Sequence, residues 1–194
     1  PEGVGRSAAE QLGSFPVFVK PCSQGSSVGV AKANNMLELA EGLTEAFRMD
    51  SKVLVEEFIR GQEVEVAVLG NENPFASVCG EIDSGAEFYD YEAKYISDSA
   101  RLYIPARIAE QTAEQVREQA VRVYTAMGCR GLSRVDFFVT PDGGTVFNEI
   151  NTIPGFTSIS MYPKLFAASG IAYPALLDNL ISLAMEDEPW YRQQ

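Results

Sequence analysis

The chain has 194 residues and a formal net charge of −12, from 15 Lys and Arg against 27 Asp and Glu. General nucleic-acid binding requires a basic face, so this balance predicts no nucleic-acid partner. Histidine is absent, which excludes Ser-His-Asp and Cys-His catalysis and histidine metal sites within the chain. Any chemistry must therefore use lysine, arginine, carboxylates, hydroxyls and backbone groups.

Hydrophobic residues make up 46% of the chain and charged residues 22%, as in globular proteins that bury a core. No apolar run is long enough to span a bilayer, and the start at Pro1 lacks a signal segment. These features predict a cytoplasmic protein with no membrane partner. Cys22, Cys79 and Cys129 are widely spaced and form no metal pattern, so we expect core or near-core residues in a reducing compartment.

Apolar and alternating runs in the first half of the chain predict strands. We place these strands at 15–19, 28–33, 53–59, 63–68 and 75–82. Apolar residues from Met36 to Phe47 recur with helical spacing, and Asn34 or Asn35 precedes them as an N-cap.

The second half begins with residues 83–107, a polar and aromatic stretch without a clear period, which we interpret as a long loop. The hydrophobic pattern then predicts a helix, a hairpin and a helical end. We place the helix at 116–127, the hairpin strands at 133–140 and 145–151, and the last apolar helical stripe at 176–184. Strands and helices do not alternate strictly, so the predicted class is α+β.

The hairpin itself predicts a metal site. With Asp142 and Gly143 as its loop, Asp136 faces Glu149, and Arg134 faces Asn151 two residues away on the same side of the sheet. Two carboxylates directly opposite repel unless a cation lies between them, and an oxygen-only ligand set suits Mg²⁺. The alternative is a solvated strand face that Arg134 neutralises in part.

The stretch from Lys20 to Gly29 has a lysine at the end of a strand, followed by glycines and hydroxyls. Such a loop can bring backbone N–H groups close to phosphate, although it is not a Walker A motif and a flexible turn fits the same pattern. The strand 55–59 offers an apolar slot for adenine, and Glu63 a carboxylate for ribose. An amphipathic edge strand is the alternative there.

Two further segments have functional and structural interpretations. Residues 88–95 hold three tyrosines and Lys94 in an aperiodic loop, which is typical of a lid that carries a cation to phosphate. A partly ordered surface loop is the alternative. Gly155 follows Pro154 in a turn just after the hairpin, where its N–H can face an oxyanion beside Arg134, or where a tight turn merely needs glycine.

Together these segments resemble D-alanine–D-alanine ligases, in their order and over essentially the whole chain. The resemblance rests on residues 19–29, 88–95, 133–136 and 148–157. It implies an ATP-grasp fold, with residues 1–61 as part of the central subdomain and 62–194 as the carboxy-terminal subdomain, whose lid is the loop 83–107. It also implies a reaction in which one D-alanine is phosphorylated by ATP and the amine of a second attacks the acyl phosphate.

The resemblance assigns roles position by position. It implies that ATP contacts Lys20, Ser26, Ser27, Glu56, Glu57, Phe58, Ile59, Glu63, Lys94 and Phe138. Catalytic groups are implied at Ser26, Lys94, Tyr95, Arg134 and Gly155, with Arg134 and the Gly155 N–H as the oxyanion hole. Two Mg²⁺ ions, which Mn²⁺ can replace, are implied at Asp136, Glu149 and Asn151, and the second D-alanine at Ser160 and Met161.

Members of this family carry an amino-terminal domain that supplies another ATP-contacting lysine and much of the first D-alanine site. We therefore expect this chain alone to be inactive, and a homodimer to form through the missing region. A D-alanine–D-lactate or D-alanine–D-serine ligase, another ATP-grasp carboxylate–amine ligase, and a non-catalytic nucleotide-binding module are the alternatives. The apolar Met161 and the run around Tyr95 favour D-alanine as the acceptor.

Overall fold

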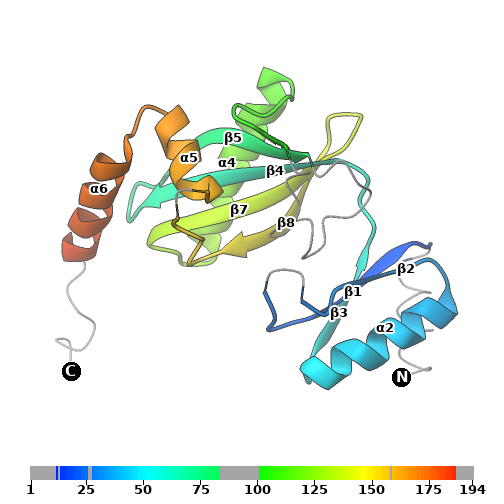
Figure 1. The fold of residues 1–194 in the computed structure, drawn as a ribbon. Helices are drawn as coiled ribbons and strands as arrows, with labels where there is room; N and C mark the ends of the chain where they lie inside the picture. Colours follow the sequence, from blue (N-terminus) through cyan, green and yellow to red (C-terminus); the bar gives the residue numbers. More distant parts are fainter. Residues whose placement is uncertain (1–11, 13, 26–27, 84–100, 158, 187–194) are drawn as a thin grey trace, which may run out of the picture. The chain divides into compact units, whose positions relative to one another are not determined.

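The computed structural model describes residues 12, 14–25, 28–83, 101–157 and 159–186. Its contacts divide the chain into two units, of which unit 1 runs to Ile59 and unit 2 comprises Arg60–Asp83 and the residues from Arg101 onwards. Figure 1 shows the helices and strands of both units. Among the described residues, no single helix could cross a membrane, and only the bent pair of the last two helices passes that test, by length and composition alone.

Unit 1 is a small antiparallel sheet packed on one helix. Its elements are β1 (Val17–Pro21), β2 (Ala31–Ala33), α2 (Met36–Met49) and β3 (Val53–Glu57), with the strand order β2-β1-β3. Val17 and Val19 of β1 are buried with Leu39 and Leu43 of α2, because alternate residues of a strand point to one face. Asn35 caps the helix, since its side chain accepts hydrogen bonds from two backbone N–H groups of the first turn.

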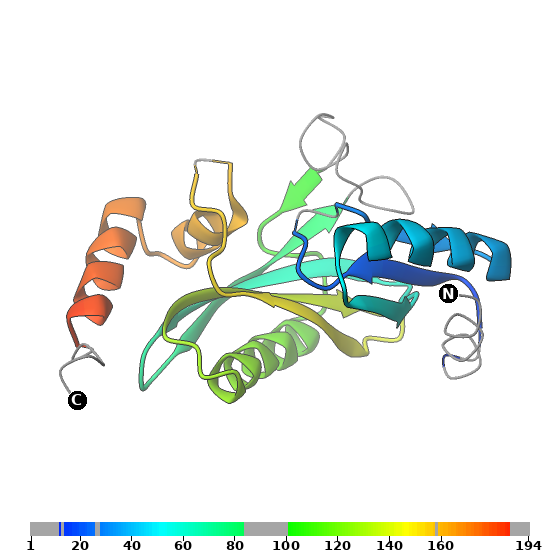
Figure 2. The same cartoon turned by 90° about the horizontal axis from the view of Figure 1, so that it is seen from below.

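Unit 2 is a five-stranded antiparallel sheet with helices on both faces, which Figure 2 shows from a second direction. Its strands lie in the order β6-β5-β4-β7-β8. The elements are β4 (Gln62–Gly70), β5 (Phe75–Asp83), β6 (Arg101–Tyr103), α4 (Glu110–Ala126), β7 (Gly131–Val139), β8 (Thr145–Asn151), α5 (Met161–Ala168) and α6 (Tyr173–Glu186). Helix α4 covers one face, while α5 and α6 pack against part of the other.

The prediction of one long loop over 83–107 is wrong at both ends. Asp83 is the last residue of β5, and Arg101–Tyr103 forms β6 by pairing with Glu81–Asp83. A strand of three residues is too short to show an alternating pattern in the sequence, and it is defined by its pairing with β5. Residues 84–100, which include Lys94 and Tyr95, lie outside the described part of the chain.

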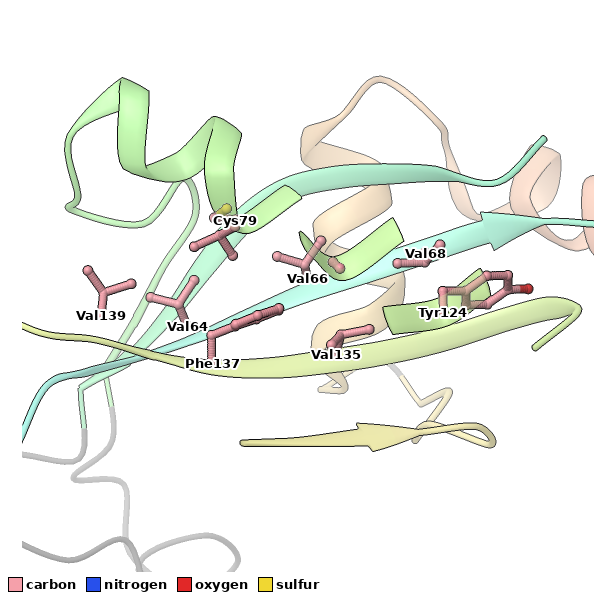
Figure 3. Close-up of a cluster of buried hydrophobic side chains, with 10 residues drawn as sticks. Val64, Val66, Val68, Cys79, Tyr124, Val135, Phe137 and Val139 are labelled. Carbon is pink, nitrogen blue, oxygen red and sulfur yellow. The ribbon is translucent and has the colours of Figure 1, made fainter. Parts of the chain in front are cut away.

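The core of unit 2 lies under α4, where alternate residues of β4 and β7 meet the helix. Its members include Val64, Val66, Val68, Cys79, Tyr124, Val135, Phe137 and Val139 (Figure 3). On the other face, Ala67 and Leu69 are buried against Tyr162 and Phe166 of α5. The next residues of β4 on that face are Glu65 and Glu63, so the part of the sheet that α5 covers ends where a polar region begins.

The cysteines have different environments. Cys79 is buried, and burial raises the pKa of its thiol to about 12. Cys129 is partly buried, as expected of a near-core residue. The prediction is wrong for Cys22, which is exposed just after β1, because the chain leaves the small sheet at Pro21.

We expect Tyr124→Phe to lower the free energy of unfolding by about 1–2 kcal/mol, because it leaves a buried carbonyl without its donor. The Tyr124 hydroxyl donates to the backbone oxygen of Gly70 at 2.7 Å, where β4 ends. Urea unfolding measures the effect. Tyr173→Phe is the control, since Tyr173 is exposed and should change stability by less than about 0.5 kcal/mol. Equal stability of the two variants would show that the bond to Gly70 is not stabilising.

Candidate functional site

The polar side chains of unit 2 lie in two rows across the middle of its sheet. In one row Asp136 of β7 pairs with Glu65 of β4 and with Glu149 of β8. In the next row Arg134 of β7 pairs with Asn151 of β8. Both pairs predicted across the hairpin, Asp136 with Glu149 and Arg134 with Asn151, are confirmed.

The register of these pairs depends on two irregularities that cancel. Near the turn, Val139 pairs with Thr145 and Phe137 with Phe147, a register that requires a three-residue loop with Gly143 at positive φ. Beyond Phe147 the register shifts by one residue, so that Asn148 has no partner of its own. Without this bulge Glu149 would pair with Val135 and share its face, which α4 covers. The bulge therefore brings Glu149 to the face of Asp136.

Arg134 is the cation of this region. Its Nε and one terminal nitrogen donate to the two carboxylate oxygens of Asp136 at 2.8 and 2.7 Å, and its Nε lies 3.2 Å from Glu65 Oε2. Burial lowers the pKa of Arg134. The hydrogen bonds to Asp136 and the charges of Glu65, Asp136 and Glu149 raise the pKa by a larger amount, so the net change is upward. Arg134 is therefore a permanent cation held among carboxylates.

The group of Asp136, Glu149 and Asn151 fits a hard cation. The amide of Asn151 donates to Asp136 at 3.1 Å and to Glu149 at 3.3 Å, so a positive dipole already faces both carboxylates. In the part of the chain that is described, no three or more Asp, Glu, Cys and His side chains form a metal-binding group. Two carboxylates and an amide suit Mg²⁺ that takes its other ligands from phosphate and water.

The turn after β8 brings Gly155 close to Ser160, at the start of α5. A side chain at Gly155 would place its Cβ 2.9 Å from Ser160 Oγ, so a larger residue there would require the Ser160 side chain to move. Ser160 Oγ also accepts a hydrogen bond from the Thr157 N–H at 3.0 Å. Met161, predicted at the second substrate, is buried in the core under α5 and is only 6% exposed.

In unit 1, two predicted nucleotide residues contact each other. Lys20 Nζ of β1 lies 2.7 Å from Glu56 Oε2 of β3. On the same face, the rings of Phe18 and Phe58 lie 5.9 Å apart, and Lys32 Nζ lies 4.9 Å from the centre of the Phe58 ring. This face combines aromatic rings with two lysines, which is an arrangement that can hold a planar base and an anion.

The other predicted site residues are divided between three places. Glu57 ends β3, which stops two residues before the predicted end, so Phe58 and Ile59 follow the strand. Glu63 pairs with Phe138, one position along the same face from the pair of Glu65 and Asp136. Ser26, Ser27, Lys94 and Tyr95 lie outside the described residues.

Glu65 was not predicted as a site residue. The alternation of apolar and polar residues along β4 places Glu65 on the same face as Glu63, which is visible in the sequence. The proximity of Glu65 to Arg134 depends on the pairing of β4 with β7, which is not.

Comparison with known proteins gives consistent results. A family model described as "D-ala D-ala ligase C-terminus" matches residues 4–182. A D-alanine–D-alanine ligase of Chlorobium luteolum is 60% identical over 97% of this chain and 52% of its own length, and one of Acetivibrio thermocellus is 57% identical over 95% and 49%. The chain therefore spans about half the length of the curated relatives it matches.

Two solved structures have the same fold. The D-alanine–D-alanine ligase of Coxiella burnetii matches with a TM-score of 0.79 and 40% identity, over 95% of this chain and 49% of that one. The VanG D-Ala:D-Ser ligase of Enterococcus faecalis matches with a TM-score of 0.84 and 43% identity, over 94% and 53%. These matches confirm the α+β class and the ATP-grasp fold predicted from the sequence.

We expect Arg134→Met to lower the free energy of unfolding by about 3 kcal/mol or more, because it leaves buried carboxylates side by side without their cation. Chemical unfolding at neutral pH measures the loss. Arg48→Met is the control, since Arg48 pairs with Glu45 on the exposed side of α2 and should change stability by less than about 0.5 kcal/mol. A similar small effect of both substitutions would contradict the role of Arg134 in holding the carboxylates.

Proposed function

This chain belongs to the D-alanine–D-alanine ligase family, and we propose that it forms the nucleotide- and metal-binding part of an ATP-dependent ligase. The ligase joins two D-alanines through D-alanyl phosphate, for peptidoglycan precursor synthesis. The observation that carries this proposal is the group of Arg134, Asp136, Glu149 and Asn151 on one face of the sheet. It places a fixed cation beside oxygen ligands, which is what transfer of a phosphoryl group to a carboxylate requires.

Asp136, Glu149 and Asn151 are the proposed ligands of Mg²⁺, two ions in the full site. Mg²⁺ offsets the negative charge of the phosphates and holds them in place. Since Mg²⁺ gives up its water reluctantly and favours phosphate as a co-ligand, we expect these residues to bind it together with nucleotide. Before that, Arg134 and the Asn151 amide offset the repulsion between Asp136 and Glu149.

Arg134 and the Gly155 N–H are the proposed oxyanion hole. When the amine of the second D-alanine attacks the acyl phosphate, negative charge develops on the carbonyl oxygen, and preorganised donors stabilise it. Arg134 is suited to this role because its guanidinium is held by carboxylates before substrate arrives. Gly155 is exposed and has no side chain to obstruct its N–H.

Each unit, taken by itself, has residues that we propose as nucleotide ligands. In unit 1, Lys20 would bind phosphate, and Glu56, Glu57, Phe58 and Ile59 would hold adenine, with the Phe18–Phe58 pair as an apolar wall. The ion pair of Lys20 with Glu56 keeps the lysine on the ligand face until an anion is present. In unit 2, Glu63 beside Phe138 would accept hydrogen bonds from the ribose hydroxyls.

The remaining groups of the proposed site lie outside the described residues. Ser26 and Ser27 would line the phosphates, Ser26 would hydrogen-bond Tyr95, and Lys94 would reach the transferred phosphoryl group. A cytoplasmic location follows from the use of ATP, and self-association stays a prediction.

D-alanine is the proposed acceptor, at Ser160 and Met161. Curated relatives named D-alanine–D-alanine ligase share 52–60% identity with this chain, whereas among the solved structures the D-Ala:D-Ser ligase shares 43% and the D-alanine–D-alanine ligase of Coxiella burnetii 40%. The high TM-score of that structure, 0.84, keeps a D-alanine–D-serine ligase as the second candidate. Met161 does not distinguish the two candidates, because its side chain is buried over Gly80.

We expect Glu149→Gln to reduce Mg²⁺-dependent phosphate release by at least about 100-fold in a full-length protein carrying this sequence, because a proposed metal ligand loses its charge. Phosphate release from ATP in the presence of D-alanine measures the effect, and nucleotide binding without metal should persist. The control is Glu118→Gln on the exposed side of α4, which should stay within about twofold of the parent. Unchanged turnover of Glu149→Gln would refute the metal assignment.

We expect the same full-length protein to make mainly D-alanyl-D-alanine when D-alanine, D-serine and D-lactate compete as acceptors. The curated relatives of 52–60% identity carry the name D-alanine–D-alanine ligase, whereas selection of serine requires a polar partner for its hydroxyl. Chromatographic analysis of the products decides the question. Mainly D-alanyl-D-serine would support the second candidate, and mainly depsipeptide would contradict both.

A further inference from the structure

Glu65 is a buried carboxylate beside the site to which the proposed function gives no role. It lies in the middle of β4, directly opposite Asp136, and is 7% exposed. Its other neighbour across the sheet is Gly80 of β5. Met161 and Leu165 of α5 lie so close over Gly80 that an added Cβ would come within 2.5 and 2.7 Å of them. Glu65 is thus fixed between the end of the α5 cover and the polar row.

Arg134 lies within reach of two carboxylates on neighbouring strands. Both oxygens of Asp136 accept hydrogen bonds from its guanidinium, while Glu65 Oε2 lies 3.2 Å from its Nε. A guanidinium has five N–H donors in a rigid fork, so it can keep one anion when another leaves. Arg134 is therefore hydrogen-bonded to Asp136 and within ion-pair distance of Glu65.

The two partners differ in what else they do. Asp136 is also a proposed metal ligand, and an oxygen that binds a cation is a poorer acceptor for the guanidinium. If Asp136 were the sole anchor, Arg134 would compete with the metal for the same oxygens. Glu65 lies on the β4 side of Arg134, whereas Glu149 and Asn151 lie on the β8 side of Asp136. Glu65 can thus hold Arg134 without competing for the metal.

We propose that Glu65 is a positioning residue, which retains Arg134 at the site when Asp136 turns to the metal. This inference rests on the proposed function, because it presumes that Asp136 is a metal ligand and that Arg134 acts on the substrate. Two consequences follow. Without the charge of Glu65, Arg134 relies on Asp136 and competes with the metal for its oxygens, which weakens metal binding. When the metal is bound, Arg134 is held less firmly, which lowers kcat more than it changes the KM for ATP.

The test compares Glu65→Gln with Glu81→Gln in a full-length protein carrying this sequence. Glu81 is a matched control, because it is also buried in this sheet and also binds an arginine, Arg107, at 2.6 Å. Its side chain lies on the face of Val64, which α4 covers. The readouts are Mn²⁺ binding with ADP, followed by electron paramagnetic resonance, then kcat and KM for ATP, and the unfolding midpoint.

We expect Glu65→Gln to weaken Mn²⁺ binding and to lower kcat by about 10-fold each, as is usual for partners of metal ligands, with little change in the KM for ATP at saturating metal. Glu81→Gln should lower the unfolding midpoint and leave both other quantities unchanged. Glu65→Asp, which keeps the charge at shorter reach, should lose less than Glu65→Gln and serves where the amide variant does not fold. Loss of stability alone in Glu65→Gln, or equal losses in the Asp and Gln variants, would overturn the inference.

An Arg134→Met background separates this inference from the proposed function. If Glu65 acts through Arg134, adding Glu65→Gln to Arg134→Met should not weaken Mn²⁺ binding any further. A full additional loss would show that Glu65 acts independently and would overturn the inference. Normal kcat in Arg134→Met alone would instead refute the proposed role of Arg134, and the Mn²⁺ measurements would still decide whether Glu65 and Arg134 are coupled.

Discussion

Arg134 is the cation on which the polar half of the sheet depends. Glu65, Asp136 and Glu149 follow one another across β4, β7 and β8, and like charges directly opposite on neighbouring strands destabilise a sheet. Glu65 and Asp136 are also buried, where an uncompensated charge costs several kcal/mol. The planar fork of arginine satisfies both oxygens of Asp136 and still reaches Glu65, which the single ammonium of lysine would not do in the same way.

The position of this polar region follows from where α5 begins. On one face of β4, Leu69 and Ala67 are buried under α5, and the next residue on that face is Glu65. Met161, the first residue of the helix, lies over Gly80, the β5 partner of Glu65. The face of β4 therefore changes from apolar to charged between Ala67 and Glu65, two residues apart. The turn that holds Gly155 joins the end of β8 to this helix, so the same short segment places a backbone N–H and ends the apolar cover.

The hairpin was predicted correctly at Asp136–Glu149 and Arg134–Asn151, but for an incomplete reason. A two-residue loop was assumed, whereas the structure has a three-residue loop with Gly143 at positive φ. The bulge at Asn148 shifts the register back by one residue and restores the predicted pairs. The glycine of the turn is visible in the sequence. The bulge cannot be read from the sequence, because nothing around Asn148 shows that it lacks a cross-strand partner.

The residues that carry chemistry were easier to predict than the residues that support them. Asp136, Glu149 and Asn151 belong to one hairpin, where local turn chemistry limits the register. The contact of Glu65 with Arg134 requires the pairing of β4 with β7, and in the chain β5, β6 and α4 lie between these strands. Alternation shows which face of β4 Glu65 occupies, but only the pairing shows what it faces. The same limit applies to Met161 of α5, whose burial depends on Gly80 of β5, five elements earlier in the chain. A carboxylate that a sequence pattern assigns to a half-buried strand can therefore determine how the neighbouring site holds its cation.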